Sequence, residues 1–365
     1  MRNTFALAAV AALAGYAAAQ TSTTCDPLNT TCPADSALGT EHTWWFNETL
    51  DATIWNMTDG ALKYTDEGAE FTLETNGSSL LLQSNFYIFF GVVESWVKMA
   101  KGAGIISSVV LESDDLDEID WEWLGYNTSL VQTDFFGKGN TTGYDRGTSV
   151  GMSNADTEFH NYTTYWDHDR LEWWLDDVLV RTVNYSESLT LGGKNYPQTP
   201  CQVKIGIWPS GEESESLGTI EWGGGLVDWD DAPFTMTVQR VRVKDFHSGK
   251  EYKYGNHSGD WQSIEVVSGN STTVTELNKK AKETLAEKWD DLGEGAHIGI
   301  YVSCGVVGAA CVGAFMWWCI RQRRQGRLAQ ALDDTKFADQ RTEMLNYQNE
   351  WKQSEWRKSG YNKVG

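Results

Sequence analysis

The stretch Asp117-Glu118-Ile119-Asp120-Trp121-Glu122-Trp123-Leu124-Gly125 alternates carboxylates with large apolar residues. A period of two predicts a β-strand, which places Glu118, Asp120 and Glu122 on one face and the apolar residues on the other. Neighbouring carboxylates raise one another's pKa, so we expect one of the three to hold a proton. A protonated acid beside an ionised carboxylate is the pair that cleavage of a glycosidic bond requires.

The surrounding sequence predicts an all-β domain. From about Thr40 to Phe246, short β-type runs alternate with clusters of Gly, Asn, Asp and Ser, and no helical period is evident. Asp176-Asp177, between two apolar runs, predicts a tight hairpin turn. Many short strands in a segment of domain size favour a β-sandwich or barrel with one large core. Trp121 and Trp123 are expected to face that core and hold the carboxylates in place.

Two apolar runs predict a signal peptide and a membrane span. Residues 1–19 contain one Arg, an apolar run and a small-residue cleavage site, which predicts a signal peptide. Residues 297–320 hold an uncharged apolar run followed at once by a basic cluster, which predicts one transmembrane helix. The expected order is a disulfide segment at 20–40, a catalytic domain at 41–246, a linker or stalk at 247–296, the span at 297–320 and a cytoplasmic tail at 321–365.

Glycosylation sequons agree with this topology. All Asn-x-Ser/Thr sequons lie before the apolar run, which predicts a type I protein of the plasma membrane or cell wall whose N-terminal part is extracellular. The acceptor residues are Asn29, Asn47, Asn56, Asn76, Asn127, Asn140, Asn161, Asn184, Asn256 and Asn270.

The cysteines also indicate an oxidising compartment. Cys25 and Cys32 are spaced for a small disulfide loop. Cys201 has no evident partner in the sequence, and we interpret it as a buried free thiol.

Charge and motif content exclude several classes of function. The formal net charge is −22, which excludes nucleic acid as a partner of the extracellular part and is compatible with a neutral polysaccharide. His160 and His168 lack the spacing of metal ligands, so we expect no metal. The sequence has neither a Gly-x-Ser-x-Gly motif nor a phosphate-binding glycine loop, which argues against esterase and nucleotide chemistry.

Four stretches carry a resemblance to a known family. Glu118-Ile119-Asp120-Trp121-Glu122 resembles the Glu-x-Asp-x-Glu signature of glycoside hydrolase family 16. Three flanking stretches are similar to those of the fungal Crh-type cell-wall transglycosylases of this family. They are Cys25-Asp26-Pro27-Leu28 with Thr31-Cys32-Pro33, Gly104-Ile105-Ile106-Ser107-Ser108, and Gly218-Thr219-Ile220-Glu221-Trp222-Gly223-Gly224-Gly225 with Asp228-Trp229.

The resemblance implies a β-jelly roll with a concave glycan-binding cleft. It implies an enzyme that cuts chitin and joins the new end to β-glucan or to another chitin chain in the cell wall. By motif position, Glu118 corresponds to the nucleophile, Glu122 to the general acid and then base, and Asp120 to the helper. This chemistry needs no metal or organic cofactor.

Aromatic and polar residues are expected along the glycan path, because aromatic faces stack on the C–H groups of sugar rings. The candidates, chosen partly by family position, are Trp208, Trp222, Trp229, Phe135, Tyr144, Gln132, Asp134 and Glu221. Core packing is the preferred interpretation for five other tryptophans, namely Trp44, Trp45, Trp166, Trp173 and Trp174.

Two other functions fit the same residues. A β-glucan endo-hydrolase would use the same carboxylates, and product analysis separates it from a transglycosylase because only transfer makes longer chains. A lectin-like wall sensor would bind oligosaccharides without cleaving them.

Overall fold

The computed structural model describes residues 23–142, 146–279, 315–327, 336, 339–346 and 348–350. The chain forms two compact units, Met1–Lys280 and Ala281–Gly365. Among the described residues, every strand and the candidate site belong to the first unit.

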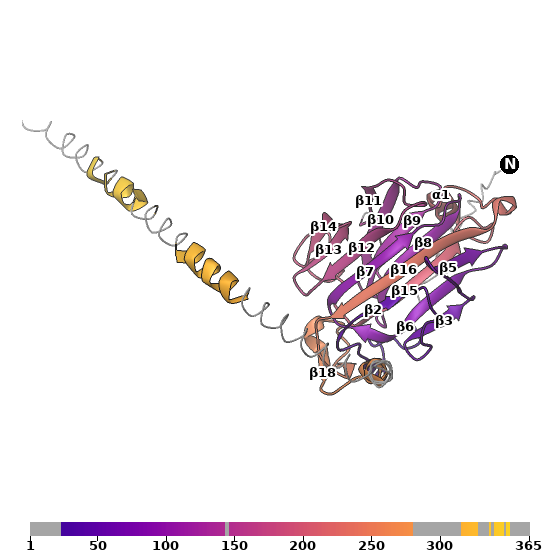
Figure 1. Ribbon diagram of the computed structural model, residues 1–365, viewed down its shortest axis with the longest axis horizontal. Coiled ribbons are helices and arrows are strands. Elements are labelled where there is room, and N and C mark those ends of the chain that lie inside the picture. Colours follow the sequence, from indigo (N-terminus) through magenta and orange to yellow (C-terminus); the bar gives the residue numbers. More distant parts are fainter. Residues whose placement is uncertain are drawn as a thin grey trace, which may run out of the picture. The chain divides into compact units, whose positions relative to one another are not determined.

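The first unit is a sandwich of two antiparallel sheets, which overlie each other in Figure 1. The site sheet, as we call the seven-stranded one, has the order β11-β10-β9-β8-β15-β6-β3. Its strands are β3 (Trp55–Asp59), β6 (Leu80–Ile88), β8 (Ile105–Ser113), β9 (Glu118–Leu124), β10 (Leu130–Phe136), β11 (Thr148–Gly151) and β15 (Cys201–Pro209). The predicted all-β sandwich is confirmed.

The second sheet, which we call the supporting sheet, has the order β14-β13-β12-β7-β16-β5-β4, with β2 paired to β16. Its strands are β2 (Glu41–Trp45), β4 (Lys63–Thr65), β5 (Gly68–Leu73), β7 (Gly91–Lys98), β12 (His160–Trp166), β13 (Arg170–Leu175), β14 (Val178–Asn184) and β16 (Phe234–Asp245). Asp176 and Asp177 form the β13–β14 turn with φ values of 49° and 64°, as a two-residue hairpin turn requires.

The core between the sheets fixes strand β9. Ile119, Trp121 and Trp123 point into this core and are buried. Tyr162 of the supporting sheet packs edge-on against both tryptophans, with ring centroids 5.4 Å from Trp121 and 4.5 Å from Trp123. The indole N–H of Trp121 also donates a hydrogen bond to the hydroxyl of Thr164 at 3.1 Å. The predicted role of the two tryptophans as core anchors is therefore confirmed.

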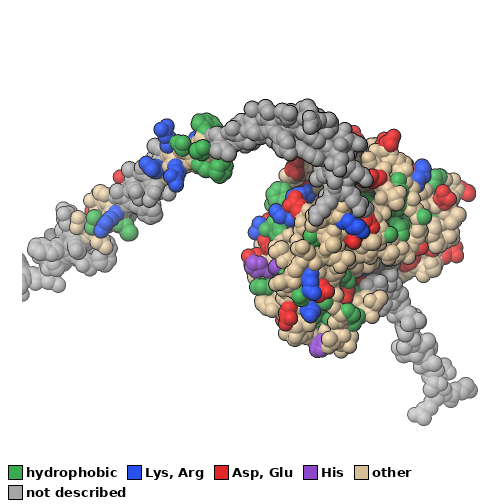
Figure 2. Space-filling model, turned by 60° about the horizontal axis from the view of Figure 1, so that its bottom comes forward, with side chains coloured by type: hydrophobic (Ala, Val, Ile, Leu, Met, Phe, Trp, Pro, Cys, Tyr) green, Lys and Arg blue, Asp and Glu red, His purple; other side chains and the backbone are tan. Residues whose placement is uncertain are grey.

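Acidic side chains occur at several places on the face of the unit that Figure 2 presents. Their scatter is in keeping with the formal net charge of −22.

Part of the segment predicted as a linker, 247–296, forms strands of a small third sheet. The order of this sheet is β1-β17-β18, and its strands are β1 (Asp35–Ser36), β17 (Glu251–Tyr254) and β18 (Ile264–Val267). Tyr252 is fully buried, and its hydroxyl donates a hydrogen bond to Asp245 at the end of β16. A short 3₁₀ helix, η2 (Trp261–Ser263), and a helix at 272–279 follow in the same unit. Residues 247–279 are thus part of the folded domain, because the third sheet buries apolar side chains that a linker would expose.

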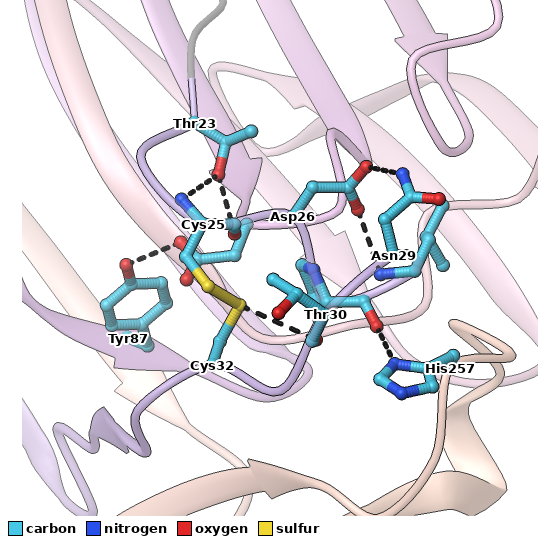
Figure 3. The surroundings of a disulfide bond; sticks show 11 residues. Thr23, Cys25, Asp26, Asn29, Thr30, Cys32, Tyr87 and His257 are labelled. Carbon is cyan, nitrogen blue, oxygen red and sulfur yellow. Dashed lines mark hydrogen bonds between the residues drawn. A yellow bond between two sulfur atoms is a disulfide. The ribbon is translucent and has the colours of Figure 1, made fainter.

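The disulfide between Cys25 and Cys32 is present, which confirms that prediction. Figure 3 shows the small loop that it closes, with Thr23 at its start and His257 beside it. The imidazole Nδ1 of His257 lies 2.6 Å from the carbonyl oxygen of Pro27, which ties the loop to the segment between β17 and β18. Cys201 is a buried free thiol, also as predicted.

The second unit is described only in part. Residues 315–327 are helical. In the described parts of the chain, we find no helix with both the length and the apolar character needed to cross a bilayer. Most of the predicted span at 297–320, the predicted signal peptide at 1–19 and much of the tail lie outside the described residues.

Candidate active site

Strand β9 presents three carboxylates on the face of the site sheet that points away from the core. Residues paired across antiparallel strands share a face, so the strand register defines the surroundings of each acid. We call this surface the acidic face. Each acid of β9 lies between one residue of β10 and one of β8. Glu118 lies between Phe136 and Glu112, Asp120 between Asp134 and Val110, and Glu122 between Gln132 and Ser108.

Asp120 lies at the centre of the acidic face and is 2% exposed. Its pKa is raised well above its ordinary value, first by burial and then by the charges of Glu118, Glu122 and Asp134. Its side chain is hydrogen-bonded to Glu118, and this contact also favours the protonated form. Burial, the neighbouring charges and this contact all favour the protonated form of Asp120, which donates a hydrogen bond to Glu118.

Glu122 is the second group on this face that holds a proton. Burial raises its pKa to about 8, and the charges of Glu118 and Asp134 contribute to the shift. A carboxyl with this pKa remains protonated at neutral pH, as a general acid must. The acidic face therefore holds, at alternate positions of one strand, Glu118 with its hydrogen bond to Asp120 and two carboxyls, Asp120 and Glu122, whose pKa values are raised.

An aromatic pair lies beside the Glu122 end of β9. Trp208 of β15 and Trp222 stack with ring centroids 6.1 Å apart and planes 27° apart. With Ile106 and Leu124 they form an apolar cluster separate from the main core. Leu124 pairs with Ile106, and Ile106 pairs with Trp208, so the cluster lies two residues beyond Glu122 along β9.

Helix α1 (Leu217–Trp222) holds the second ring of this pair. The helix begins where the Ser216 hydroxyl accepts a hydrogen bond from the amide of Thr219 at 3.1 Å. At its other end the indole N–H of Trp222 donates to the amide oxygen of Gln132 at 2.9 Å. Because Gln132 pairs with Glu122, this bond connects the aromatic pair to the acidic face.

Other predicted glycan contacts lie elsewhere. Phe135 is fully buried in the core opposite Ile119, so its prediction as a cleft residue is wrong. Trp229, in the 3₁₀ helix η1 (Trp229–Asp231), packs on Phe234 and the main core instead of joining the aromatic pair. Glu221 is exposed on α1, and Tyr144 lies outside the described residues.

The sequence interpretation missed Phe136, Glu112 and Lys204. Phe136 shares the face of Gln132 and Asp134, and strict alternation along β10 would have selected it in place of Phe135. Lys204 lies between the core residues Val203 and Ile205 of β15 and forms an ion pair with Glu112. A lysine within an apolar strand was the available signal.

The predicted core tryptophans divide into two groups. Trp44, Trp166 and Trp173 are buried, as expected. Trp45, by contrast, is 48% exposed at the end of β2, so its assignment to the core is wrong. Trp174 is partly exposed on β13.

Metal-ligand geometry occurs away from the acidic face. Among the described residues, Asp167, His168 and Asp169 bring their ligand atoms within 4.8 Å of one another. They form the turn between β12 and β13 of the supporting sheet, so they are not part of the candidate site.

Comparison with known proteins identifies the family. The profile of "Glycosyl hydrolases family 16" matches residues 49–224. Crh-like protein 3 of Aspergillus fumigatus is 59% identical over 346 residues, which are 95% of this chain and 95% of that protein. The chain belongs to the Crh-like proteins of glycosyl hydrolases family 16. Crh-like protein 2 of Botryotinia fuckeliana is 49% identical over 88% of this chain and 72% of its own length.

A solved structure supports the same assignment for the fold. The structure named "Crh5 transglycosylase in complex with NAG" is 43% identical, with a TM-score of 0.64, and covers 66% of this chain and 99% of that one. The predicted membership of family 16, its jelly-roll fold and a glycosidase or transglycosylase activity are thereby confirmed for this Crh-like protein.

The proton-holding acids predict that the Crh-like domain is more stable in acid than in mild alkali. The folded-state pKa of Glu122 is raised to about 8 from an unfolded value of about 4.3. Between these two values the unfolded chain binds fewer protons, so the free energy of unfolding falls as pH rises. Burial of Asp115 and Asp245, each with a pKa raised to about 7, acts in the same direction.

Thermal unfolding of the soluble domain measures this effect. We expect a midpoint that is higher near pH ~5 than near pH ~8, and a smaller difference in Glu122→Gln. A midpoint that rises across this interval would contradict the assigned protonation states.

Proposed function

We propose that this Crh-like protein is a retaining transglycosylase that cleaves chitin and transfers the new reducing end to β-glucan or chitin. In this proposal Glu118 is the nucleophile, Asp120 its helper and Glu122 the general acid and base. The observation that carries it is the arrangement of β9, where three acids lie at alternate positions on one face, Asp120 is hydrogen-bonded to Glu118, and burial raises the pKa of Glu122 to about 8. A nucleophile beside a protonated acid is the arrangement required before the first bond breaks.

In the first half-reaction, a carboxylate oxygen of Glu118 attacks the anomeric carbon of the bound donor. The glycosidic C–O bond breaks as Glu122 transfers its proton to the leaving oxygen, and a glycosyl ester remains on Glu118. Asp120 keeps its hydrogen bond to Glu118 and limits the repulsion between that carboxylate and its neighbours. The core contacts of Trp121 and Trp123 hold the strand in register throughout.

In the second half-reaction, a hydroxyl of the acceptor sugar replaces the leaving group. Formation of the ester removes the charge of Glu118, which is one of the causes of the raised pKa of Glu122. The pKa of Glu122 therefore falls in the intermediate, and its carboxylate takes the proton of the attacking hydroxyl. The ester bond to Glu118 then breaks, and Glu122 is again protonated.

The position of the aromatic pair favours transfer to a sugar over hydrolysis. Trp208 and Trp222 lie beyond Glu122 along the strand. Because the proposed general acid protonates the leaving oxygen, the pair lies in this proposal on the side where the leaving group departs and the acceptor enters. Their apolar faces suit the C–H face of a pyranose and not a water molecule. The name of the Crh5 structure, which includes NAG, supports a donor built from this sugar, the repeating unit of chitin.

Product profiling tests this function. The purified soluble domain is incubated with chitin oligomers, with and without fluorescent β-glucan oligomers, and the products are separated by size. We expect products longer than either substrate, and labelled acceptors that carry donor sugars. Shorter products alone would indicate the endo-hydrolase, and binding without cleavage would indicate the lectin-like sensor.

We also propose that the protein acts at the outer surface of the plasma membrane, held by a span at 297–320. The disulfide Cys25–Cys32 supports an oxidising compartment for the catalytic domain. The run of apolar residues followed by basic ones supports the span.

Membrane extraction tests the anchor. The full chain is expected to remain in the membrane pellet after alkaline carbonate treatment, whereas a chain that ends at residue 296 is expected in the medium. Both forms should lose mass on treatment with an N-glycosidase. Release of the full chain by carbonate would reject the membrane anchor.

A further inference from the structure

An ion pair lies buried in the acidic face, next to the catalytic strand. The ammonium of Lys204 on β15 contacts the carboxylate of Glu112 on β8. Glu112 is 2% exposed and Lys204 is 3% exposed. Both side chains point away from the core, because their neighbours Leu111, Val203 and Ile205 fill it.

The strand register brings this pair against the proposed nucleophile. Glu112 pairs with Glu118 across the β8–β9 ladder, so two carboxylates face each other directly. Lys204 pairs with Val110, which in turn pairs with Asp120. Like charges at directly opposed positions of a sheet destabilise it unless a cation compensates them. Lys204 is placed to provide that compensation.

The local charge balance makes this cation important. Among the described residues that β8, β9, β10 and β15 direct to the acidic face, Lys204 is the one cation. Two further cations lie near β10: the Arg146 guanidinium is 4.9 Å from the Phe136 ring centroid, whereas Arg181 contacts Thr133, Phe135 and Trp173 on the core side of the strand. Among the described residues, the charged and titratable groups that face Glu118 or the ion pair are Asp120 and Glu122 on β9, Asp134 on β10, Glu112 on β8, Lys204 on β15, Asp114 and Tyr87 beside the pair, and Arg146 against Phe136.

We propose that Lys204 and Glu112 are positioning residues for nucleophilic attack: Lys204 keeps Glu118 ionised, and Glu112 holds the Lys204 ammonium and limits its effect on Glu118. Lys204 neutralises Glu112, and Glu112 in turn prevents the ammonium from pairing directly with Glu118. The nucleophile thus faces a neutral ion pair in place of a bare carboxylate or a bare ammonium. This inference rests on the proposed role of Glu118.

The two single variants have opposite expected effects. Lys204→Met leaves the Glu112 carboxylate uncompensated beside Glu118, which favours the protonated nucleophile. Glu112→Gln leaves the Lys204 ammonium to stabilise the ionised nucleophile. The acid limb of the pH–rate profile should therefore move up by about one pH unit in Lys204→Met and down by about one in Glu112→Gln. In the double variant the two shifts should cancel.

The experiment measures kcat/KM for transfer from chitin oligomers to a fluorescent acceptor over the acid to neutral range. It uses the full-length protein and all three variants, and thermal unfolding checks that each variant folds. Gln202→Met is the matched control: Gln202 lies on β15 like Lys204, and its replacement removes a hydrogen bond to the carbonyl of Ser84 on β6 without changing charge. Its acid limb should coincide with that of the wild type.

Each outcome decides the proposal. Opposite shifts that cancel in the double variant support it. An unmoved acid limb in Lys204→Met overturns it, even where the overall rate falls, since a purely structural role lowers activity without moving the limb. If Lys204→Met does not fold, the profile of Glu112→Gln decides alone, and an unmoved limb there has the same meaning. A wild-type protein without transfer activity would instead reject the proposed function.

Discussion

Replacement of Glu118 by Gln is expected to lower the rate of chitin transfer by about 10⁴-fold to 10⁶-fold while the domain remains folded. An amide has the shape of the carboxyl but does not attack the anomeric carbon, so the glycosyl ester cannot form. The substitution also removes one negative charge from the acidic face, where Asp120, Glu122 and Asp134 gather. The thermal unfolding midpoint should consequently be unchanged or raised. Initial rates and thermal unfolding measure the two effects.

A smaller variant separates loss of the nucleophile from general damage to the site. In Glu118→Ala, added azide has room to attack the anomeric carbon from the side that the carboxylate occupied. The glycosyl azide product should then have the inverted anomeric configuration. Glu74→Gln, at an exposed acid outside the site sheet, is the matched control and should have the wild-type rate. Wild-type transfer by Glu118→Gln would reject the proposed nucleophile.

The period of the sequence was enough to predict strand β9 and the face on which its acids lie. A carboxylate at every second position and a tryptophan between them leave one plausible orientation in a sandwich, because only the apolar side can be buried. The structure bears this out for Trp121 and Trp123. The same alternation places Phe135 of β10 on the opposite face from Gln132 and Asp134. The prediction of Phe135 as a cleft residue, which followed ring chemistry and family position, is therefore wrong.

Features that depend on pairing between distant segments were not accessible in this way. Lys204 and Glu112 are 92 residues apart, and only the β15–β8 register brings them together. The third sheet joins β1 to β17, more than 200 residues later in the chain, although the polar composition around β17 and β18 indicated a linker. A local sequence pattern predicts which face of the sheet a residue lies on, but it does not predict which strands pair. Charge compensation within a sheet depends on that pairing, so the sequence alone did not indicate it.

Replacement of Glu122 by Gln is expected to lower transfer from chitin oligomers by about 10²-fold to 10⁴-fold. The amide cannot protonate the leaving sugar oxygen, whose departure as an alkoxide is slow. An activated donor such as a dinitrophenyl glycoside has a leaving group that needs no proton, so formation of the glycosyl ester should be nearly as fast as in the wild type. A burst of dinitrophenol, measured in the pre-steady state, reports this step.

The pH dependence gives an independent check on Glu122. The general acid acts in its protonated form, and its pKa in the free enzyme is raised to about 8 by burial and by the charges of Glu118 and Asp134. The wild-type kcat/KM for chitin oligomers should therefore be sustained at neutral pH and fall as pH rises through about 8. Glu122→Gln should lack this alkaline limb, because its amide does not titrate. Equal losses on both donors, or an alkaline limb that persists in Glu122→Gln, would assign the acid to another residue, and Asp134 would be the next to test because it lies on the same face beside Asp120.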